Sequence, residues 1–150
     1  MEKQKVKQLI KSYQQTYIFA MTHIHQSISE ISANTVDLSI EQFFVLREIA
    51  AYDGISATEL AATLSVNKSA ITPKLKRLVE KGYIRREKNH QDKRAVILTI
   101  SEKGNNVYEE CEKRLELLVN EWLEILGEED SEHFFELFQK ITNLVVQSKK

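Results

Sequence analysis

Basic side chains crowd into a single segment of the chain, between residues 65 and 94. Ten lysines and arginines fall there against three acids, which gives the segment a net charge of +7, whereas the whole 150-residue chain carries −1. Residues 1–64 carry −2 and residues 95–150 carry −6. One basic face on an acidic body is the charge pattern of a nucleic-acid-binding protein.

The first half of this segment predicts a helix-turn-helix. Ser56 with Glu59 forms a capping box that opens a short helix through Leu64, and a second helix begins near Asn67 and stops at Gly82. In such a unit the N-terminal part of the second helix enters the major groove. The predicted DNA-binding residues of this helix are Asn67, Lys68, Ser69, Ala70, Thr72, Lys74, Lys76 and Arg77. The alternative is a solvated helix face that happens to be basic.

The second half predicts a basic hairpin, or wing, over about 83–100. Two β-type segments, 83–87 and 95–100, flank a polar connection, and the basic tip suits the electronegative minor groove. The predicted DNA-binding residues of the wing are Arg86, Lys88, His90, Asp92, Lys93 and Arg94. Asp92 is unexpected among these bases, and we expect it to pair with a neighbouring arginine and hold the wing in register.

Three apolar helices surround this basic unit. Apolar residues recur at helical spacing before residue 35, again between a Ser101 cap and Gly127, and once more up to residue 145. A capping box at Ser39 and Gln42 starts a further helix to about Tyr52. These three helices present more apolar surface than a small helix-turn-helix unit can bury. This favours a homodimer, in which two copies bury the surface together, over a monomer whose helices fold back onto the central unit. The predicted dimer core comprises Ile10, Trp122, Phe134, Phe138 and Ile141.

Three stretches of the basic unit form a recognisable pattern: residues 69–78, residues 80–84 and a wing signature in which Asp92-x-Arg94 leads to Leu98-Thr99-x-Ser101-x-x-Gly104. In these stretches the chain resembles the winged helix-turn-helix of the MarR family of bacterial transcription regulators. This resemblance implies a mainly α (α+β) fold in one MarR-type domain, 1–150. Residues 1–35 and 101–150 would be dimerisation helices, and 36–100 the DNA-binding lobe, with its helix-turn-helix at about 56–80.

The resemblance further implies a function. Members form obligate homodimers that bind a palindromic double-stranded operator and usually repress until a ligand or an oxidant relieves them. By resemblance the effector cleft comprises Tyr13, Tyr17, Met21, His23 and Phe44, where Tyr13 and Tyr17 could sandwich a small aromatic or phenolic ligand. The alternative is that these are core residues at helical spacing. A winged-helix module that binds another protein, without contacting DNA, is the competing function.

Two single residues raise separate questions. Pro73 would lie inside the second helix of the pair, where a proline removes one backbone hydrogen bond. The residues alone also allow a shorter helix capped by Thr72, but the resemblance favours the longer one with a local bend. Cys111, the only cysteine, is predicted to be a small core residue, because neighbouring glutamates disfavour the thiolate that a redox switch needs.

Other classes of function find no support in the sequence. His23 and His25 are two residues apart on a helix and cannot jointly hold a metal, and no glycine-rich phosphate loop or nucleophile motif occurs. We therefore expect no catalysis, metal or cofactor. No apolar run approaches the roughly 20 residues of a membrane span, and the first residues lack a secretory core. The expectation is a cytoplasmic protein with no membrane partner.

Overall fold

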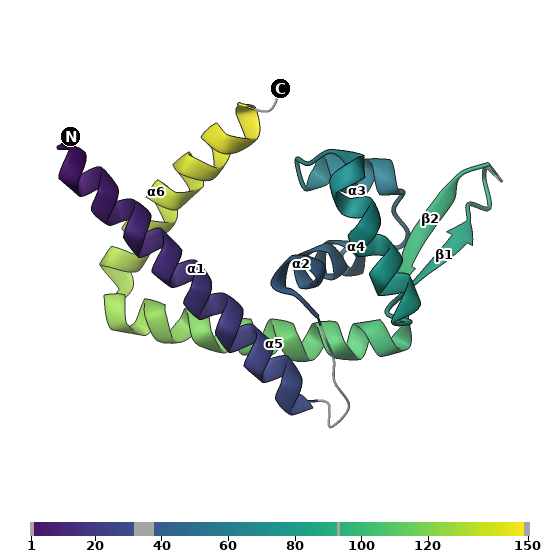
Figure 1. The fold of residues 1–150 in the computed structure, drawn as a ribbon, viewed down its shortest axis with the longest axis horizontal. Helices are drawn as coiled ribbons and strands as arrows, with labels where there is room; N and C mark the ends of the chain where they lie inside the picture. The colour runs from purple at the N-terminus through teal and green to yellow at the C-terminus, as the bar shows by residue number, and fades with distance from the viewer. Residues whose placement is uncertain (1, 32–37, 93, 149–150) are drawn as a thin grey trace.

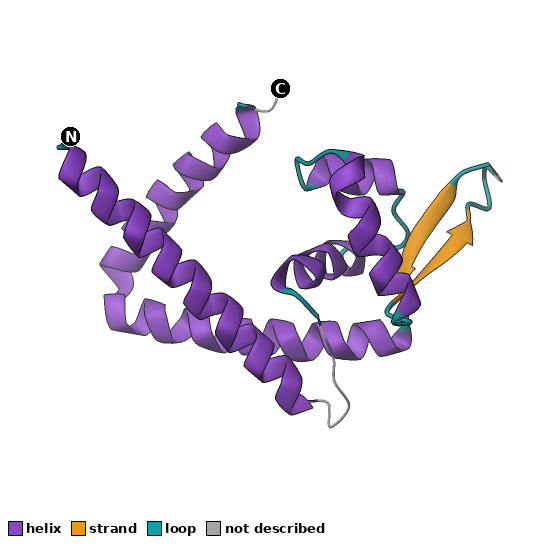
Figure 2. Cartoon of the chain, viewed as in Figure 1, coloured by secondary structure: helices purple, strands orange, loops and turns teal. Residues whose placement is uncertain are grey.

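The chain folds into six helices and one two-stranded hairpin among the residues that the structure describes. The computed structural model describes residues 2–31, 38–92 and 94–148, without the side chains of 27–29 and 31. The elements follow in the order α1 Lys3–Ile31, α2 Ile40–Ala50, α3 Ala57–Thr63, α4 Lys68–Glu80, β1 Ile84–Lys88, β2 Val96–Ile100, α5 Glu102–Leu126 and α6 Glu128–Gln147. Figures 1 and 2 show the hairpin projecting from a mainly helical chain. The predicted mainly α class is confirmed.

The helix starts are where capping residues predict them. Ser39 and Gln42 form a capping box before α2, and Ser56 and Glu59 form another before α3. The backbone and side-chain hydrogen bonds from Ser56 lower the pKa of Glu59. Gly127, with φ of +80°, ends α5 and starts α6 in a backbone conformation that favours glycine. Local signals thus define these boundaries.

The core of the lobe is built around α2. Phe43, Leu46 and Ile49 of this helix are fully buried, and Ile71, Leu75 and Leu78 of α4 are buried in the same cluster. Leu38 and Leu60 complete the packing on either side. Burying a large apolar side chain contributes about 1.5–3 kcal/mol, so this cluster is the main source of the lobe's stability.

The hairpin is antiparallel, and a short β-bridge attaches it to the lobe. Ile84 pairs with Ile100 at its base, and Lys88 pairs with Val96 near its tip. Ile55, just before α3, exchanges two backbone hydrogen bonds with Leu98, of 3.1 and 2.8 Å. Leu98 is buried against the lobe, so the base of the wing is fixed while its tip extends outward.

Helices α1, α5 and α6 form the other part of the chain. Figure 1 shows α5 running from the base of the hairpin away from the lobe, α1 crossing it, and α6 turning back from its far end. No residue of α6 is buried. The described helices include none with both the length and the apolar character that a membrane crossing requires. The predicted domain boundary at 35/36 lies outside the described residues.

Two of the ion pairs between described residues join α5 to other helices. The Arg47 guanidinium of α2 donates to both carboxylate oxygens of Glu112 on α5, at 2.8–3.0 Å, and this contact raises the pKa of Arg47. Arg114 of α5 contacts Glu30 of α1 at 2.9 Å. The bidentate geometry of the first pair orients α2 relative to α5 as well as attracting it.

Cys111 lies in the core of the lobe. Its side chain is buried on α5, and burial raises its pKa to about 11. The glutamate neighbour Glu110 adds to the shift in the same direction. A thiol that stays protonated at neutral pH is a poor nucleophile, so the residue acts as a small apolar side chain in this position.

Gly104 sits where α5 passes closest to the backbone of Tyr83. A Cβ atom at this position would overlap the carbonyl oxygen and the carbonyl carbon of Tyr83. Backbone atoms cannot move aside as the end of a flexible side chain can, so only glycine permits this approach. The contact brings the first turn of α5 against the segment between α4 and β1.

Gly104→Ala is expected to lower the free energy of unfolding by about 1–3 kcal/mol, because the added methyl group overpacks this contact. Alanine is intrinsically the better helix residue by about 1 kcal/mol, so a net loss identifies the clash as the cause. Urea denaturation at fixed protein concentration would measure it, with Asn106→Ala on the exposed side of α5 as the control. A Gly104→Ala protein as stable as the wild type would contradict the close contact.

Candidate nucleic-acid interface

The exposed face of α4 carries most of the residues predicted for DNA binding. The side chains of Lys68, Ser69, Ala70, Thr72, Lys76 and Arg77 are all exposed. Asn67 is the N-cap residue, and its side chain makes no capping hydrogen bond. This leaves the amide of Asn67 and the basic groups of the helix on the surface, where they can reach phosphates or base edges.

Pro73 lies inside α4, which continues without interruption from Lys68 to Glu80. The longer of the two predicted helices is therefore the observed one. Pro73 has no N–H to donate to the carbonyl of Ser69, so the helix lacks one backbone hydrogen bond on its exposed side. The Thr72 hydroxyl donates to the Lys68 carbonyl at 2.9 Å, which adds a bond within the same turn.

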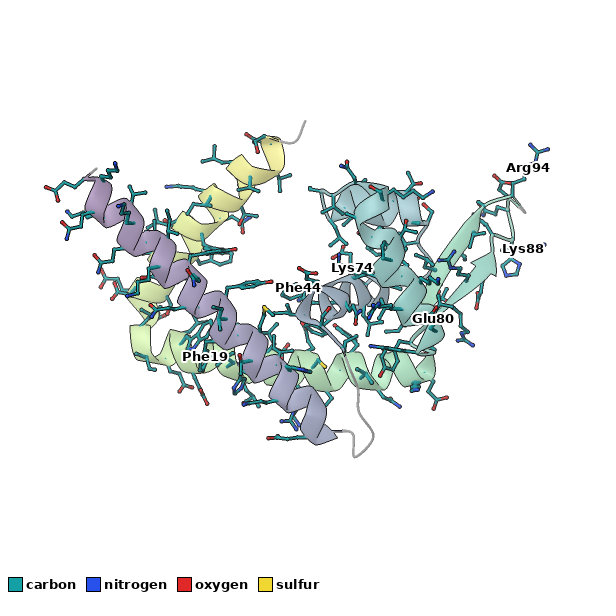
Figure 3. All side chains as sticks on the ribbon, in the orientation of Figure 1. Phe19, Phe44, Lys74, Glu80, Lys88 and Arg94 are labelled. Carbon is teal, nitrogen blue, oxygen red and sulfur yellow. The ribbon has the colours of Figure 1, made fainter. Side chains whose placement is uncertain are left out.

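Lys74 is placed differently from the other bases of α4. It is half-buried, its ammonium donates to the Ala70 carbonyl at 3.2 Å, and it lies 3.7 Å from the Glu41 carboxylate of α2. Figure 3 shows the Lys74 side chain close to α2. Lys74 is therefore the least available of the predicted bases for a phosphate. Its acidic partner is 33 positions away in sequence and could not be identified from spacing.

In the described part of the wing, four of the predicted cationic or histidine side chains are exposed. Arg86, Lys88, His90 and Arg94 are all exposed, and Figure 3 shows Arg94 at the outer end of the hairpin with Lys88 beside it. Lys93 was also predicted for this site, but it lies outside the described residues. The tip is closed by hydrogen bonds from Asn89 N–H to the Ala95 carbonyl, 2.9 Å, and from Ala95 N–H to the Asp92 carbonyl, 3.0 Å.

Asp92 braces the wing by a different bond from the one predicted. Its carboxylate accepts a hydrogen bond from the backbone N–H of Arg94, at 3.0 Å. Within the described part of the chain, none of the ion pairs involves Asp92. The bond is the turn-forming contact that aspartate makes two residues ahead, and it leaves the Arg94 guanidinium unpaired and directed outward.

The helix and the wing face a common hollow of about 530 Å³. Lys68 and Thr72 line it from α4, and Arg86 and Arg94 line it from the wing. The cationic groups of two separate elements thus border one concave surface. A polyanion lying along this surface would contact both elements at once.

The start of α3 also borders this hollow. Ser56, Ala57 and Thr58 contribute to its lining, although the sequence singles out only Ser56, as a capping residue. Their small size makes room for a ligand on that side. From the sequence one can infer only that the first helix of a helix-turn-helix packs beside the second. This does not predict that Ser56, Ala57 and Thr58 line a binding site.

The five residues predicted for an effector cleft do not line one cavity of the single chain. Tyr13 and Tyr17 stack with their ring centroids 6.4 Å apart, and both are exposed. Met21 lines a cavity of about 330 Å³ with Leu38 and Ile40, whereas His23 lines a separate one of about 230 Å³ with Arg114.

Phe44, the fifth of these residues, is 43% exposed and lies on the side of the lobe toward α1 and α6 (Figure 3). Its ring contacts that of buried Phe43 in a tilted arrangement, with the centroids 5.7 Å apart and the planes at 42°. Of the described residues, no group of three or more His, Cys, Asp or Glu is placed to hold a metal ion.

The residues predicted for a dimer core are largely exposed in the single chain. Ile10, Phe134, Phe138 and Ile141 are all at least half exposed, and Trp122 is half-buried. Phe134 and Phe138 stack on one side of α6 with centroids 5.5 Å apart. An apolar surface of this extent is unusual on a monomeric protein.

Comparison with known proteins places these features in context. The model of the MarR family matches residues 38–96. The chain is 30% identical to the HTH-type transcriptional regulator BilQ of Clostridium symbiosum (strain WAL-14163) over 117 residues, which cover 75% of this chain and 77% of that protein.

Solved structures give a similar result. The transcriptional regulator BldR from Sulfolobus solfataricus superposes with a TM-score of 0.68 and 30% identity, covering 95% of this chain and 99% of that one. A mutant MarR from E. coli complexed with operator DNA superposes with a TM-score of 0.74 and 26% identity, covering 91% and 95%. Both similarities extend over the lobe and the long helices.

Asp92→Ala is expected to speed hydrogen exchange at the Arg94 amide by about three- to tenfold, because a hydrogen bond of this kind contributes about 1 kcal/mol. Asp92→Asn removes the same charge but keeps an oxygen acceptor, so its amide should exchange close to the wild-type rate. NMR exchange rates would separate loss of the bond from loss of the charge. Equal acceleration in both variants would show that the bond does not order the tip.

Proposed function

Because the chain belongs to the MarR family of DNA-binding transcription regulators, we propose that it is a homodimeric repressor that binds a palindromic operator and is released by a small-molecule effector. The family consists of transcription regulators rather than enzymes. Each protomer would insert α4 into a major groove and place its wing in the flanking minor groove. A two-fold axis would set the two recognition helices about 34 Å apart, one turn of DNA.

The observation that carries this proposal is the hollow shared by α4 and the wing. Lys68 approaches it from the helix and Arg86 and Arg94 from the hairpin, so bases on both elements can neutralise phosphates of one duplex. Arg94 is free of an ion pair with Asp92 and extends from the tip, the geometry that suits insertion into a narrow minor groove. Residues 1–64 and 95–150 carry −2 and −6, so the largest concentration of positive charge lies in the segment that forms this face; a smaller group of four lysines lies at the start of α1.

Support for a homodimer comes from the apolar surface of α1, α5 and α6. Phe138 is 57% exposed, Leu144 67% and Ile125 84%, although all three lie on amphipathic helices. Leaving such side chains in water forgoes about 25 cal/mol for each Å² that a partner could cover. A second copy presents the same surface, and a two-fold arrangement buries both at once.

The effector proposal rests on the aromatic surface beside the proposed interface. Tyr13 and Tyr17 present nearly parallel ring faces on α1, and Phe44 presents a third ring from the lobe. A small aromatic or phenolic ligand would stack on these faces and bridge α1 to the lobe. Binding there would change the position of the lobe relative to the dimer helices, and the half-site separation with it.

Arg94→Ala is expected to weaken binding to the DNA upstream of the protein's own coding sequence by about ten- to hundredfold without unfolding the protein. A gel shift repeated over a range of salt concentrations measures this, and the wild-type affinity should fall steeply with salt. Lys113→Ala removes the same charge from an exposed site on α5 and serves as the control. Wild-type protein that binds no DNA even at low salt would favour the protein-interaction module instead.

Phe138→Asp is expected to convert the dimer into a monomer at micromolar concentration, because a buried unpaired carboxylate at the interface carries a large desolvation cost. Sedimentation velocity reports the change directly. Asn143→Asp adds the same charge to the polar face of α6 and should leave the dimer intact. A wild-type protein that sediments as a monomer at this concentration would refute the two-fold arrangement.

A further inference from the structure

A single hydroxyl group connects the end of the recognition helix α4 to the start of α5. The Ser101 hydroxyl oxygen accepts a hydrogen bond from the Gly104 N–H at 3.0 Å, and so caps α5. The same hydroxyl donates its proton to the Gly82 carbonyl at 2.5 Å. Gly82, with φ of +75°, is the residue at which the chain turns away from α4. The hydroxyl is therefore a hydrogen-bond acceptor and a hydrogen-bond donor at the same time.

Three further contacts surround this hydroxyl. The Ser101 N–H donates to the Tyr83 carbonyl at 2.9 Å, and the Lys103 ammonium donates to the Lys81 carbonyl at 3.1 Å. The same ammonium lies 5.3 Å from the centre of the buried Tyr83 ring. Together with the close approach at Gly104, these contacts form a joint between residues 81–83 and 101–104. Figure 1 shows α4, the hairpin and α5 meeting at this point.

The joint lies between the DNA-binding surface and the proposed dimer surface. At one end α4 carries the exposed bases, and at the other α5 leads to exposed Leu117, Ile125 and Leu126. In the proposed dimer, the angle between α4 and α5 would therefore set how far each recognition helix lies from the two-fold axis. A second tie, the Arg47–Glu112 ion pair, joins α2 to α5 further along. Without the joint, the angle between α4 and α5 would vary more, but the Arg47–Glu112 ion pair would still restrict it.

We propose that Ser101 is a positioning residue for DNA binding, whose hydroxyl holds the angle between α4 and α5 and thereby selects the separation of the two operator half-sites. This role rests on the dimeric, operator-binding function proposed above. Ser101 itself is not required to touch DNA. Ser101 instead affects the affinity of the dimer for operators of different half-site spacing. A rigid joint lowers the affinity for any spacing that would require the two lobes to move.

Three substitutions separate the joint from simple helix capping. Ser101→Thr keeps a hydroxyl that can accept and donate, so it preserves both bonds. Ser101→Asp keeps an acceptor for the Gly104 N–H, and a carboxylate is a strong N-cap, but it has no proton for the Gly82 carbonyl. Ser101→Ala loses both bonds. Asn106→Asp places the same negative charge on an exposed site in α5 and controls for repulsion of DNA.

The test uses the full-length protein and a duplex that the wild type selects from a random library, with its half-site spacing then changed by one and two base pairs. Wild type, Ser101→Thr and Asn106→Asp should share one spacing preference. Ser101→Asp and Ser101→Ala should bind the duplex with the selected spacing about three- to tenfold more weakly than the wild type does. Their affinity for the duplexes with altered spacing should change little, so they should discriminate less between spacings. Thermal unfolding of each variant is followed in parallel.

The outcomes separate this role from the proposed function. A Ser101→Asp protein with the wild-type spacing preference would show that capping of α5 suffices, and would overturn the role of Ser101 alone. Should Ser101→Ala not fold, the comparison of Ser101→Asp with Ser101→Thr still decides. A wild type that selects no duplex with two half-sites overturns the proposed function, and the role of Ser101 with it.

Discussion

The burial of α2 is the constraint on which the arrangement of the lobe depends. Phe43, Leu46 and Ile49 lie along one side of this short helix and are completely buried, and Val45, which points to a different side, is buried as well. Helix α4 packs on one side, α5 on another, and β2 and α1 complete the enclosure. Helix α4 and strand β2 are therefore positioned against the same helix, and β1 is placed through its pairing with β2. Loss of volume at α2 would move α4, the wing and α5 together rather than one at a time.

The two parts of the chain use their apolar residues in opposite ways. In the lobe these residues are buried within one protomer, whereas on α1 and α6 they face outward. Ile24 of α1 and Cys111 of α5 pack into the buried cluster of the lobe, and the joint at Ser101 and the Arg47–Glu112 ion pair add hydrogen bonds and charge to this connection. Directional contacts of this kind hold an angle better than apolar packing, which tolerates sliding. The dimer proposed above, which would read a fixed half-site separation, would benefit from such a connection.

Sequence reasoning predicted the parts of this structure that depend on neighbouring residues. The capping boxes at Ser39 and Ser56, the helix break at Gly127 and the two hairpin strands all follow from spacing along the chain, and each lies within a few residues of its predicted place. The exposed bases of α4 and the wing were predictable because amphipathic periodicity separates inward from outward positions.

Contacts between distant residues were not predictable in the same way. The partner of Lys74 is Glu41, 33 positions away on another helix. The error at Asp92 is of another kind: its bond to the Arg94 backbone N–H is local, but an arginine side chain was expected as the partner. Met21 and His23 are neighbours in sequence but open into different cavities, because successive residues of a helix point in different directions. The second bond of Ser101 is likewise invisible in the capping pattern, which accounts only for its bond to Gly104.

The uneven distribution of charge has a consequence for the moments before binding. A protomer with +7 in one segment and negative charge on both sides of it has a large electric dipole although its net charge is close to zero. In the field of DNA such a molecule rotates as it approaches, so that its basic face leads and its acidic helices trail. Collisions in the wrong orientation are repelled rather than merely unproductive. Acidic helices α5 and α6 would thus orient the protein toward DNA without touching it.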